Sequence, residues 1–208
     1  MVREGFAVAG ALAIAAGWAW VASGRSTVLR VLPAVHLALG LGTIVLLGSD
    51  LSLGSPAASL AAGAGSGLVL YGATRAFVAT VAPWEPFRRH VAEAYAEAGT
   101  EPLARRLVLA LAISVPGEEL FLRGLLQPRL SASIGAAAAA VATVAVEVAA
   151  NIPSRRLPIV AGALVGGAVW SALAWRSGGV LAPIASHVVW TGLMLVRPPA
   201  VAGEMMRA

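Results

Sequence analysis

Several ionisable residues lie inside long apolar stretches of this chain, where charged side chains are rare. Glu118, Glu119 and Arg123 share one stretch, Glu147 lies in a second, and His187 lies in a third. A charged group costs about 2.5–3.5 kcal/mol at the centre of a bilayer on insertion scales, so we expect these residues to face a bundle interior or a wet cavity. A partly desolvated glutamate can act as a general base toward water. A nearby histidine can orient that water or bind the developing oxyanion.

The spacing separates the roles of the two neighbouring glutamates. Glu119 and Arg123 are four residues apart, so they share one helix face and can neutralise each other. Glu118 is rotated by about 100° from Glu119 and has no basic residue four positions later. Pro116 and Gly117 should loosen the preceding turn and admit water. We therefore expect Glu118 to activate water, with Glu119 and Arg123 beside it in the same catalytic site.

The composition says what kind of protein must position these residues. The 208 residues are 59% hydrophobic and only 12% charged, and the mean hydropathy is +0.83. A soluble domain carries about 25% charged residues, and disordered chains are polar, so both classes are excluded. The apolar stretches are continuous rather than alternating, which favours helices over a membrane β-barrel. The sequence predicts an all-α, polytopic membrane protein.

About seven stretches reach the roughly 20 apolar residues that a membrane span requires. They are Phe6–Ala22, Val28–Leu47, Pro56–Thr74, Leu107–Leu126, Ala132–Ala150, Leu157–Trp175 and Val180–Val196. We expect one membrane domain over residues 1–208, with three spans in 1–82, an interfacial segment in 83–106 and a four-helix catalytic core in 107–197.

The interfacial segment has the pattern of an amphipathic helix lying on the membrane surface. Gly99 should end this helix. Its apolar residues recur at helical spacing, at Trp84, Phe87, Val91, Tyr95 and Ala98.

The arginines predict the orientation of the chain in the membrane. If the spans alternate, one side receives Arg3, Arg129 and Arg176, and Arg123 stays within a span. The other side receives Arg25, Arg30, Arg75, Arg88, Arg89, Arg105, Arg106, Arg155, Arg156, Arg197 and Arg207. Because basic residues concentrate on the cytoplasmic side, we expect a protein of the cell membrane with its N-terminus outside and its C-terminus in the cytoplasm.

The residue inventory argues against a cofactor and against nucleic acid. The chain has no cysteine, which removes thiolate ligands and a cysteine nucleophile. A catalytic zinc needs about three protein ligands, and only His187 is suitably placed, since His36 and His90 are expected in the second span and on the surface helix. Zinc is therefore the weaker alternative. The net charge of +5 fits topology and contact with anionic lipid, so we expect lipid and no nucleic-acid partner.

Two motifs resemble those of the CPBP family, the CAAX proteases and bacteriocin-processing enzymes that are also called Abi proteins. The first is Glu-Glu-x-x-x-Arg, matched by Glu118, Glu119 and Arg123; the second is the stretch from Arg176 to Ile184 that leads into His187. The resemblance covers roughly residues 103–197. It implies an intramembrane endopeptidase in which the first glutamate activates a water, while the last histidine and its partner help to bind the oxyanion.

The sequence departs from the family pattern at two places. The middle motif has no histidine, and either Glu147 or Asn151 occupies its position, depending on a one-turn choice of register. The final Asn or Asp, four residues after His187, is replaced by Thr191. We hypothesise that Glu147 stands in for the missing histidine and pairs with Glu118 or His187; a glutamate that reaches interfacial water is the alternative.

The function predicted from these observations is cleavage of a membrane-anchored or lipidated protein or peptide near the membrane face, through a glutamate-activated water. One alternative is an inactive relative that binds membrane segments or confers immunity, because two motif positions are altered. A second is a proton-coupled transporter that uses Glu118, Glu147 and His187 as a relay. The absence of an internal repeat in the sequence disfavours the transporter.

Overall fold

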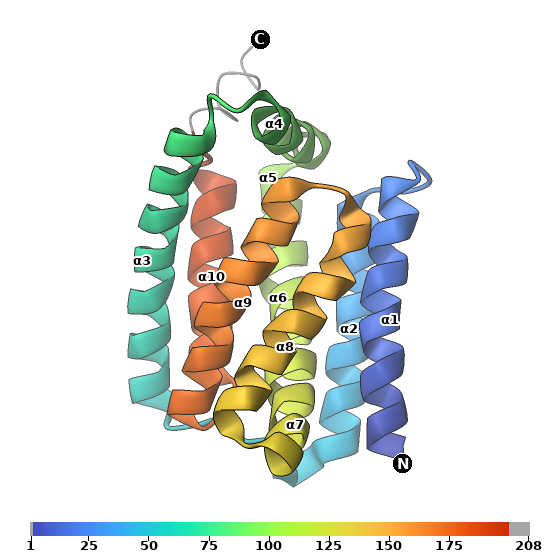
Figure 1. Ribbon diagram of the computed structural model, residues 1–208, viewed down its shortest axis with the longest axis vertical. Coiled ribbons are helices and arrows are strands. Elements are labelled where there is room, and N and C mark those ends of the chain that lie inside the picture. The colour runs from blue at the N-terminus through green and yellow to red at the C-terminus, as the bar shows by residue number, and fades with distance from the viewer. Residues whose placement is uncertain (1, 200–208) are drawn as a thin grey trace.

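A computed structural model describes residues 2–199, with the backbone alone for 97–99, and this part of the chain is entirely helical (Figure 1). The helices outside the central segment are α1 (Val2–Ala22), α2 (Val28–Leu47), α3 (Pro56–Val81), α4 (Glu85–Gly99), α8 (Ala136–Asn151), α9 (Leu157–Ser177) and α10 (Leu181–Val196), with short 3-10 turns at Gly48–Asp50 and Ile152–Ser154. No strand occurs between residues 2 and 199, so the expectation of an all-α fold is confirmed.

Several helices have the length and composition of membrane spans. Four qualify on both measures, namely Val2–Ala22, Val28–Asp50, Ala136–Ser154 and Leu157–Ser177, and α10 is a shorter apolar helix. Their outward faces carry exposed apolar residues such as Val45 and Val141, which are 82% and 71% exposed. Such residues face lipid in a membrane protein. The chain is therefore a multi-pass membrane protein, with four spans supported by length and composition rather than the full expected seven.

The fourth expected span is part of a longer helix that changes its winding twice. The chain stays helical through α5 (Leu103–Leu107), η2 (Val108–Ser114), α6 (Val115–Glu119), η3 (Leu120–Leu126) and α7 (Gln127–Ile134), and both η segments are π-helical. The predicted disturbance near Pro116 and Gly117 thus takes the form of wider turns before and after them. Wide turns of this kind are common at functional sites.

The expected start of the fifth span at Ala132 is wrong. Gly135 has a φ of 82°, so α7 ends there and α8 begins at Ala136. A positive φ is easy for glycine and strained for other residues, which makes Gly135 the turn between the two helices. The third helix, in contrast, runs beyond the expected Thr74 to Val81.

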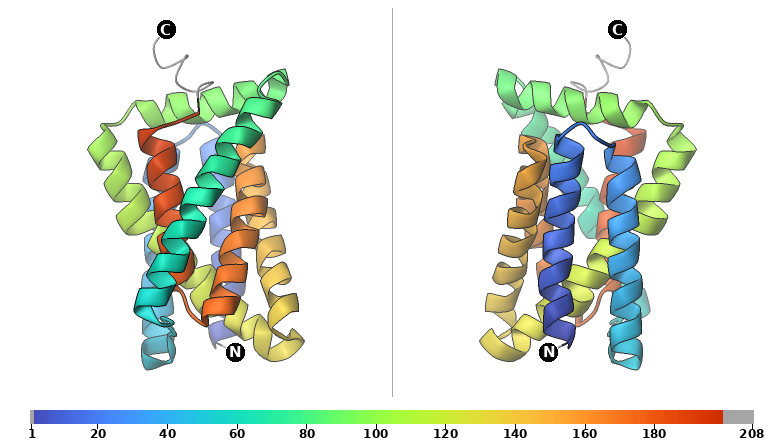
Figure 2. Two further views of the ribbon diagram at one scale, coloured as in Figure 1. Left: turned by 90° about the vertical axis from the view of Figure 1, so that its left-hand side faces the viewer. Right: turned by 90° about the vertical axis from the view of Figure 1, so that its right-hand side faces the viewer.

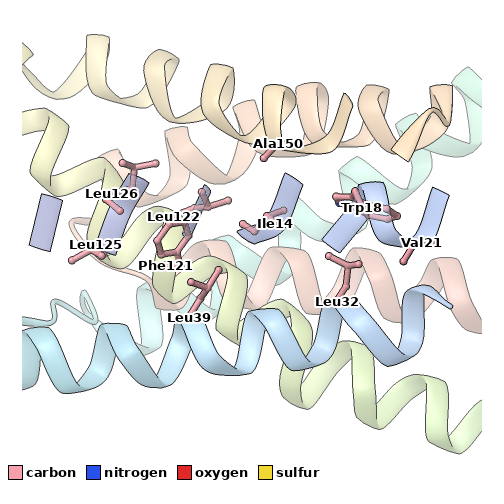
Figure 3. Packing of buried hydrophobic residues seen from close by; sticks show 11 residues of the cluster. Ile14, Trp18, Val21, Leu32, Leu39, Phe121, Leu122, Leu125, Leu126 and Ala150 are labelled. Atoms are coloured by element: carbon pink, nitrogen blue, oxygen red, sulfur yellow. The ribbon is translucent and has the colours of Figure 1, made fainter. Parts of the chain in front are cut away.

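The main apolar cluster fixes the central helix against the N-terminal pair. Phe121, Leu122 and Leu125 of η3 are almost fully buried and pack with Ile14 of α1 and Leu39 of α2 (Figure 3). Full burial of one such side chain contributes about 1.5–3 kcal/mol. This packing holds the segment that carries Glu118, Glu119 and Arg123.

Helices α3 and α10 lie side by side, and two glycines bring them close (Figure 1). A Cβ atom on Gly63 would collide with the carbonyl oxygen of Ala182, and one on Gly67 would lie 2.6 Å from that of Ser186. Small residues four apart allow this close approach between membrane helices. The contact fixes α10, which carries His187.

The amphipathic segment forms α4, which lies across one end of the bundle (Figure 2). Phe87 and Val91 are each 3% exposed and pack against Val78 of α3, which fits the predicted apolar face. Trp84 precedes the helix and is 54% exposed, so its assignment to that face is wrong. The helix ends at Gly99 as expected; the side chain of Ala98 lies outside the described residues.

Candidate active site

Two carboxylates and one guanidinium form a buried ionic network at the centre of the bundle. Arg123 Nη1 lies 3.4 Å from Glu119 Oε1, which confirms the predicted pair on one helix face. Arg123 Nη2 donates to Glu147 Oε2 of α8. The side chains of all three residues are at most 2% exposed.

The remaining donors of Arg123 are also used. Nε donates to Ser171 Oγ at 3.3 Å and Nη2 donates to the carbonyl oxygen of Gly167 at 3.1 Å, both on α9. Gln127 completes the contact by donating to the carbonyl oxygen of Ser171 at 2.9 Å. A buried charge is tolerated when it is paired and hydrogen-bonded in this way. The network therefore joins the central helix, α8 and α9.

The expected partner of Glu147 was wrong. We expected Glu118 or His187, or exposure to interfacial water, whereas Glu147 pairs with Arg123 and is 2% exposed. The reason lies on α9: a Cβ atom on Gly167 would lie 2.6 Å from Glu147 Oε2, so only glycine leaves room for the carboxylate there. Glu147 thus lies deep in the bundle rather than at the mouth of a cavity.

His187 joins this network through Glu119. Its Nδ1 lies 2.7 Å from Glu119 Oε1, and its ring stacks on the indole of Trp170 with a centroid separation of 3.6 Å and an angle of 14°. Both partners orient the imidazole. Within residues 2–199 the contact with Glu119 is the one hydrogen bond of this ring, which leaves Nε2 for another partner.

The two substituted motif positions lie apart from these hydrogen bonds. The Asn151 amide donates to the carbonyl oxygen of Glu147, four residues earlier on the same helix, at 2.8 Å. Thr191 follows His187 by one turn and is half-buried, and no hydrogen bond from it to the network is seen in the described part of the chain. The structure therefore brings together Glu119, Arg123, Glu147 and His187, and leaves Asn151 and Thr191 outside.

Glu118 points to a different neighbour from Glu119, as the 100° rotation predicts. Its Oε2 lies 3.9 Å from Nδ1 of His36 on α2, and the Glu118 side chain is 15% exposed. The same Nδ1 lies 2.7 Å from Ser114 Oγ. Of the two adjacent glutamates, Glu118 is the one that is partly exposed.

Sequence reasoning missed His36, which we expected to pack away from the site. The sequence holds a partial signal for a close contact between the two helices, because Gly40 follows His36 by one helical turn and Gly117 directly precedes Glu118. A Cβ atom on Gly40 would lie 2.7 Å from Gly117 Cα. The pairing of these two glycines across helices could not be read from one sequence.

The arrangement offers a partly exposed carboxylate, a neighbouring imidazole, and a second imidazole fixed by a buried network. These groups suit general acid–base catalysis of hydrolysis. Among residues 2–199, no group of three or more His, Cys, Asp or Glu side chains is arranged to hold a metal ion.

A groove of about 350 Å³ lies between α2 and the α5–η2 segment. Pro33, Leu37, Leu109 and Ile113 give it apolar walls, and Arg30 and Arg105 lie along it. Leu37 and Ile113 directly precede or follow the residues of the His36–Ser114 hydrogen bond.

Comparison with known proteins gives one match. The sequence model of the family described as type II CAAX prenyl endopeptidase Rce1-like matches residues 100–193. No curated protein and no solved structure matches the chain. The matched segment contains the central helix, α8, α9 and most of α10, so it includes the Glu118–Glu119–Arg123 motif, Glu147 and His187. Over this segment the chain is similar to the CAAX protease family, which agrees with the resemblance to the CPBP family that its motifs carry.

Proposed function

We propose that the protein is an intramembrane endopeptidase that cleaves a membrane-anchored or lipidated protein with a glutamate-activated water. The observation that carries the proposal is the difference in environment between Glu118 and Glu119. Glu118 is 15% exposed beside an imidazole, whereas Glu119 is fully buried between Arg123 and His187. Two carboxylates in different environments are the usual basis for assigning acid–base roles.

In the proposed reaction, Glu118 takes a proton from a water while the water oxygen attacks the carbonyl carbon of the scissile peptide bond. His187 Nε2 then lies free to donate to the oxyanion of the tetrahedral intermediate when the ring is protonated. The C–N bond breaks, and the protonated Glu118 returns its proton to the leaving amine. The products are a carboxylic acid and an amine, and Glu118 is again a carboxylate.

Glu119 and Trp170 act through His187 in this scheme. The carboxylate of Glu119 contacts Nδ1 of His187 at 2.7 Å and fixes the orientation of the ring, as a carboxylate does for a catalytic histidine. Stacking on Trp170 limits rotation of the ring. Arg123 and Glu147 hold Glu119 in place and do not touch the substrate.

We propose that the apolar or lipidated segment of the substrate reaches the site along the groove between α2 and the α5–η2 segment. The groove has apolar walls, and two of its lining residues, Leu37 and Ile113, are next in sequence to His36 and Ser114. A membrane-anchored substrate can diffuse within the bilayer to such an opening. Its scissile bond would then lie next to Glu118.

The proposed orientation has seven spans in the cell membrane with the N-terminus outside. The connections α1–α2 and α8–α9, together with α4, lie at one end of the bundle, and α2–α3, α7–α8 and α9–α10 lie at the other (Figure 1). The first end has most of the arginines, including Arg25, Arg88 and Arg155, so the positive-inside rule makes it cytoplasmic. Arg207, one of the arginines on which the expectation rested, lies outside the described residues.

The test is cleavage by the purified protein in detergent or lipid vesicles. We would use two fluorescence-quenched probes, a farnesylated peptide that ends in a CAAX sequence and a non-lipidated transmembrane peptide. Glu118→Gln should lower kcat by about 10²–10⁴-fold with unchanged thermal unfolding. Glu93→Gln is the matched control, because Glu93 lies on the surface of α4 near Arg89 and should leave the rate unchanged. Full turnover by Glu118→Gln would refute the assignment, and no cleavage of either probe by the wild-type protein would refute the proposed function.

A further inference from the structure

His36 comes from a helix outside the matched family segment, yet its side chain lies beside the proposed base. The separation of 3.9 Å between His36 Nδ1 and Glu118 Oε2 exceeds a direct hydrogen bond. Nδ1 is already bonded to Ser114 Oγ at 2.7 Å, and the other ring nitrogen, Nε2, is buried without a partner in the described part of the chain, so a water shared by the ring and the carboxylate would bind at Nε2. We propose that His36 is the second group that binds and orients the water activated by Glu118, in place of the histidine that the middle motif lacks. This inference rests on the proposed function.

The contact between α2 and α6 depends on two glycines. A Cβ atom on Gly117 would collide with the backbone carbonyl of His36, and one on Gly40 would lie 2.7 Å from Gly117 Cα. Such close approach brings the His36 ring to the turn between Ser114 and Glu118. These two residues are four apart, so they lie on one face of the central helix.

Ser114 fixes the imidazole. Its Oγ lies 2.7 Å from Nδ1 of His36, and Ser114 also belongs to the π-helical segment η2 that precedes α6. The wider turn before Pro116 sets the direction in which Ser114 and Glu118 face α2. The ring therefore has a defined orientation toward the carboxylate.

A packing role alone does not account for this ring. His36 is 5% exposed, and its Nε2 is buried with no hydrogen-bond partner in the protein. An unpartnered polar atom in such a position costs about 1–3 kcal/mol, whereas leucine would fill the same space without that cost. A water bound at Nε2 would satisfy the ring.

The two residues that the sequence offered for the middle motif are engaged elsewhere. Glu147 pairs with Arg123, and the Asn151 side chain donates to the backbone of its own helix. Among the described residues, His36 is the histidine that lies within 4 Å of Glu118. The charged groups that act on it are Glu118 and Glu119 of α6 and His187 of α10.

In the reaction, His36 keeps its protonation state overall. The water is bound between the imidazole edge and the Glu118 carboxylate, its proton passes to Glu118, and its oxygen attacks the carbonyl carbon. The proton later passes from Glu118 to the leaving amine. His36 contributes by holding the lone pair of the water toward the substrate, so its loss should lower kcat more than it raises KM.

Chemical rescue separates this role from a structural one. In the proteolysis assay, whichever probe is cleaved, His36→Ala should lower kcat by about 10²-fold with KM within about threefold. Added imidazole, which can occupy the vacated space, should restore kcat at least tenfold over an equal concentration of sodium chloride. His90→Ala on α4 is the matched control and should show neither loss nor rescue.

A second variant separates loss of activity from loss of folding. Glutamine keeps the size of the side chain and a polar group for Ser114, so His36→Gln should keep the wild-type unfolding temperature and still lose kcat. A folded His36 variant with kcat within twofold of wild type, while Glu118→Gln is inactive, would overturn the inference and leave the proposed function standing. A loss of kcat that imidazole does not restore would assign His36 to structure alone. No turnover by the wild-type protein would remove the proposed function and this inference together.

Discussion

Replacing Arg123 by methionine should destabilise the protein strongly, because the change leaves two buried carboxylates without their cation. Arg123 has a fully buried side chain and contacts Glu119, Glu147, Gly167 and Ser171. Methionine preserves most of the volume and removes the charge. Breaking a buried ion pair in this way costs about 3–5 kcal/mol. For a chain of this size each kcal/mol lowers the unfolding temperature by about 2–4 °C, so we expect a fall of about 6–20 °C.

The assay is thermal unfolding in detergent micelles, followed by the fluorescence of the six tryptophans. Arg129→Met is the matched control, since Arg129 forms a partly exposed pair with Glu4 at 2.6 Å. Exposed pairs of this kind contribute about 0–1 kcal/mol, so the control should lower the unfolding temperature by at most a few degrees. An Arg123→Met protein that unfolds within 2 °C of wild type would refute a structural role for the network.

A double variant tests the cause of the destabilisation. If stranded charge is the cause, Arg123→Met combined with Glu147→Gln should be more stable than the sum of the single changes predicts, with a coupling of about 0.5–3 kcal/mol. If lost packing is the cause, the two effects should add.

Three further changes probe the positions of the site residues. Glu147→Gln should lower stability by about 1.5–3 kcal/mol, as for a lost charged hydrogen bond, with kcat within about threefold; a tenfold loss of kcat at full stability would make Glu147 catalytic after all. Trp170→Leu should lower kcat more than it changes KM, because it removes the ring stacked on His187. Steady-state kinetics would measure both constants, and an unchanged kcat would exclude a positioning role for Trp170. Gly67→Val should abolish the close contact between α3 and α10 and reduce the folded yield. The control is Gly65→Ala, because a Cβ atom on Gly65 meets no atom within 4 Å; this change should be neutral or stabilising by up to about 1 kcal/mol. Equal yields of the two variants from gel filtration would contradict the predicted contact.

Local spacing allowed the sequence to predict much of the fold and part of the site. The bounds of α2 match the expected span at both ends, and α9 begins at the expected residue. The Glu119–Arg123 pair followed from helical geometry alone. The start of α8 could not be predicted in this way. Apolar residues continue through Gly135, and only the positive φ of Gly135 ends the preceding helix, α7.

The errors at the site all concern contacts between helices. The pairing of Glu147 with Arg123 depends on Gly167, whose lack of a side chain leaves room for the carboxylate. The contact of His36 with Ser114 joins residues 78 positions apart. Composition and periodicity show which residues must be inside the bundle, but the partner of a buried charge depends on which helices are adjacent.

The adjacent glutamates of the motif show why both are needed. Neighbouring positions on a helix point about 100° apart, so one turn can present carboxylates to two environments. Glu119 faces Arg123 and His187, where its charge is neutralised and fixes the imidazole. Glu118 faces α2 and is 15% exposed, which in the proposed mechanism gives it contact with water. A single carboxylate could not serve both purposes, since a base must exchange protons with water while a positioning group must stay ionised and fixed. The division between a fixed and a reactive carboxylate therefore follows from the helix itself, and the surrounding helices decide which glutamate takes each role.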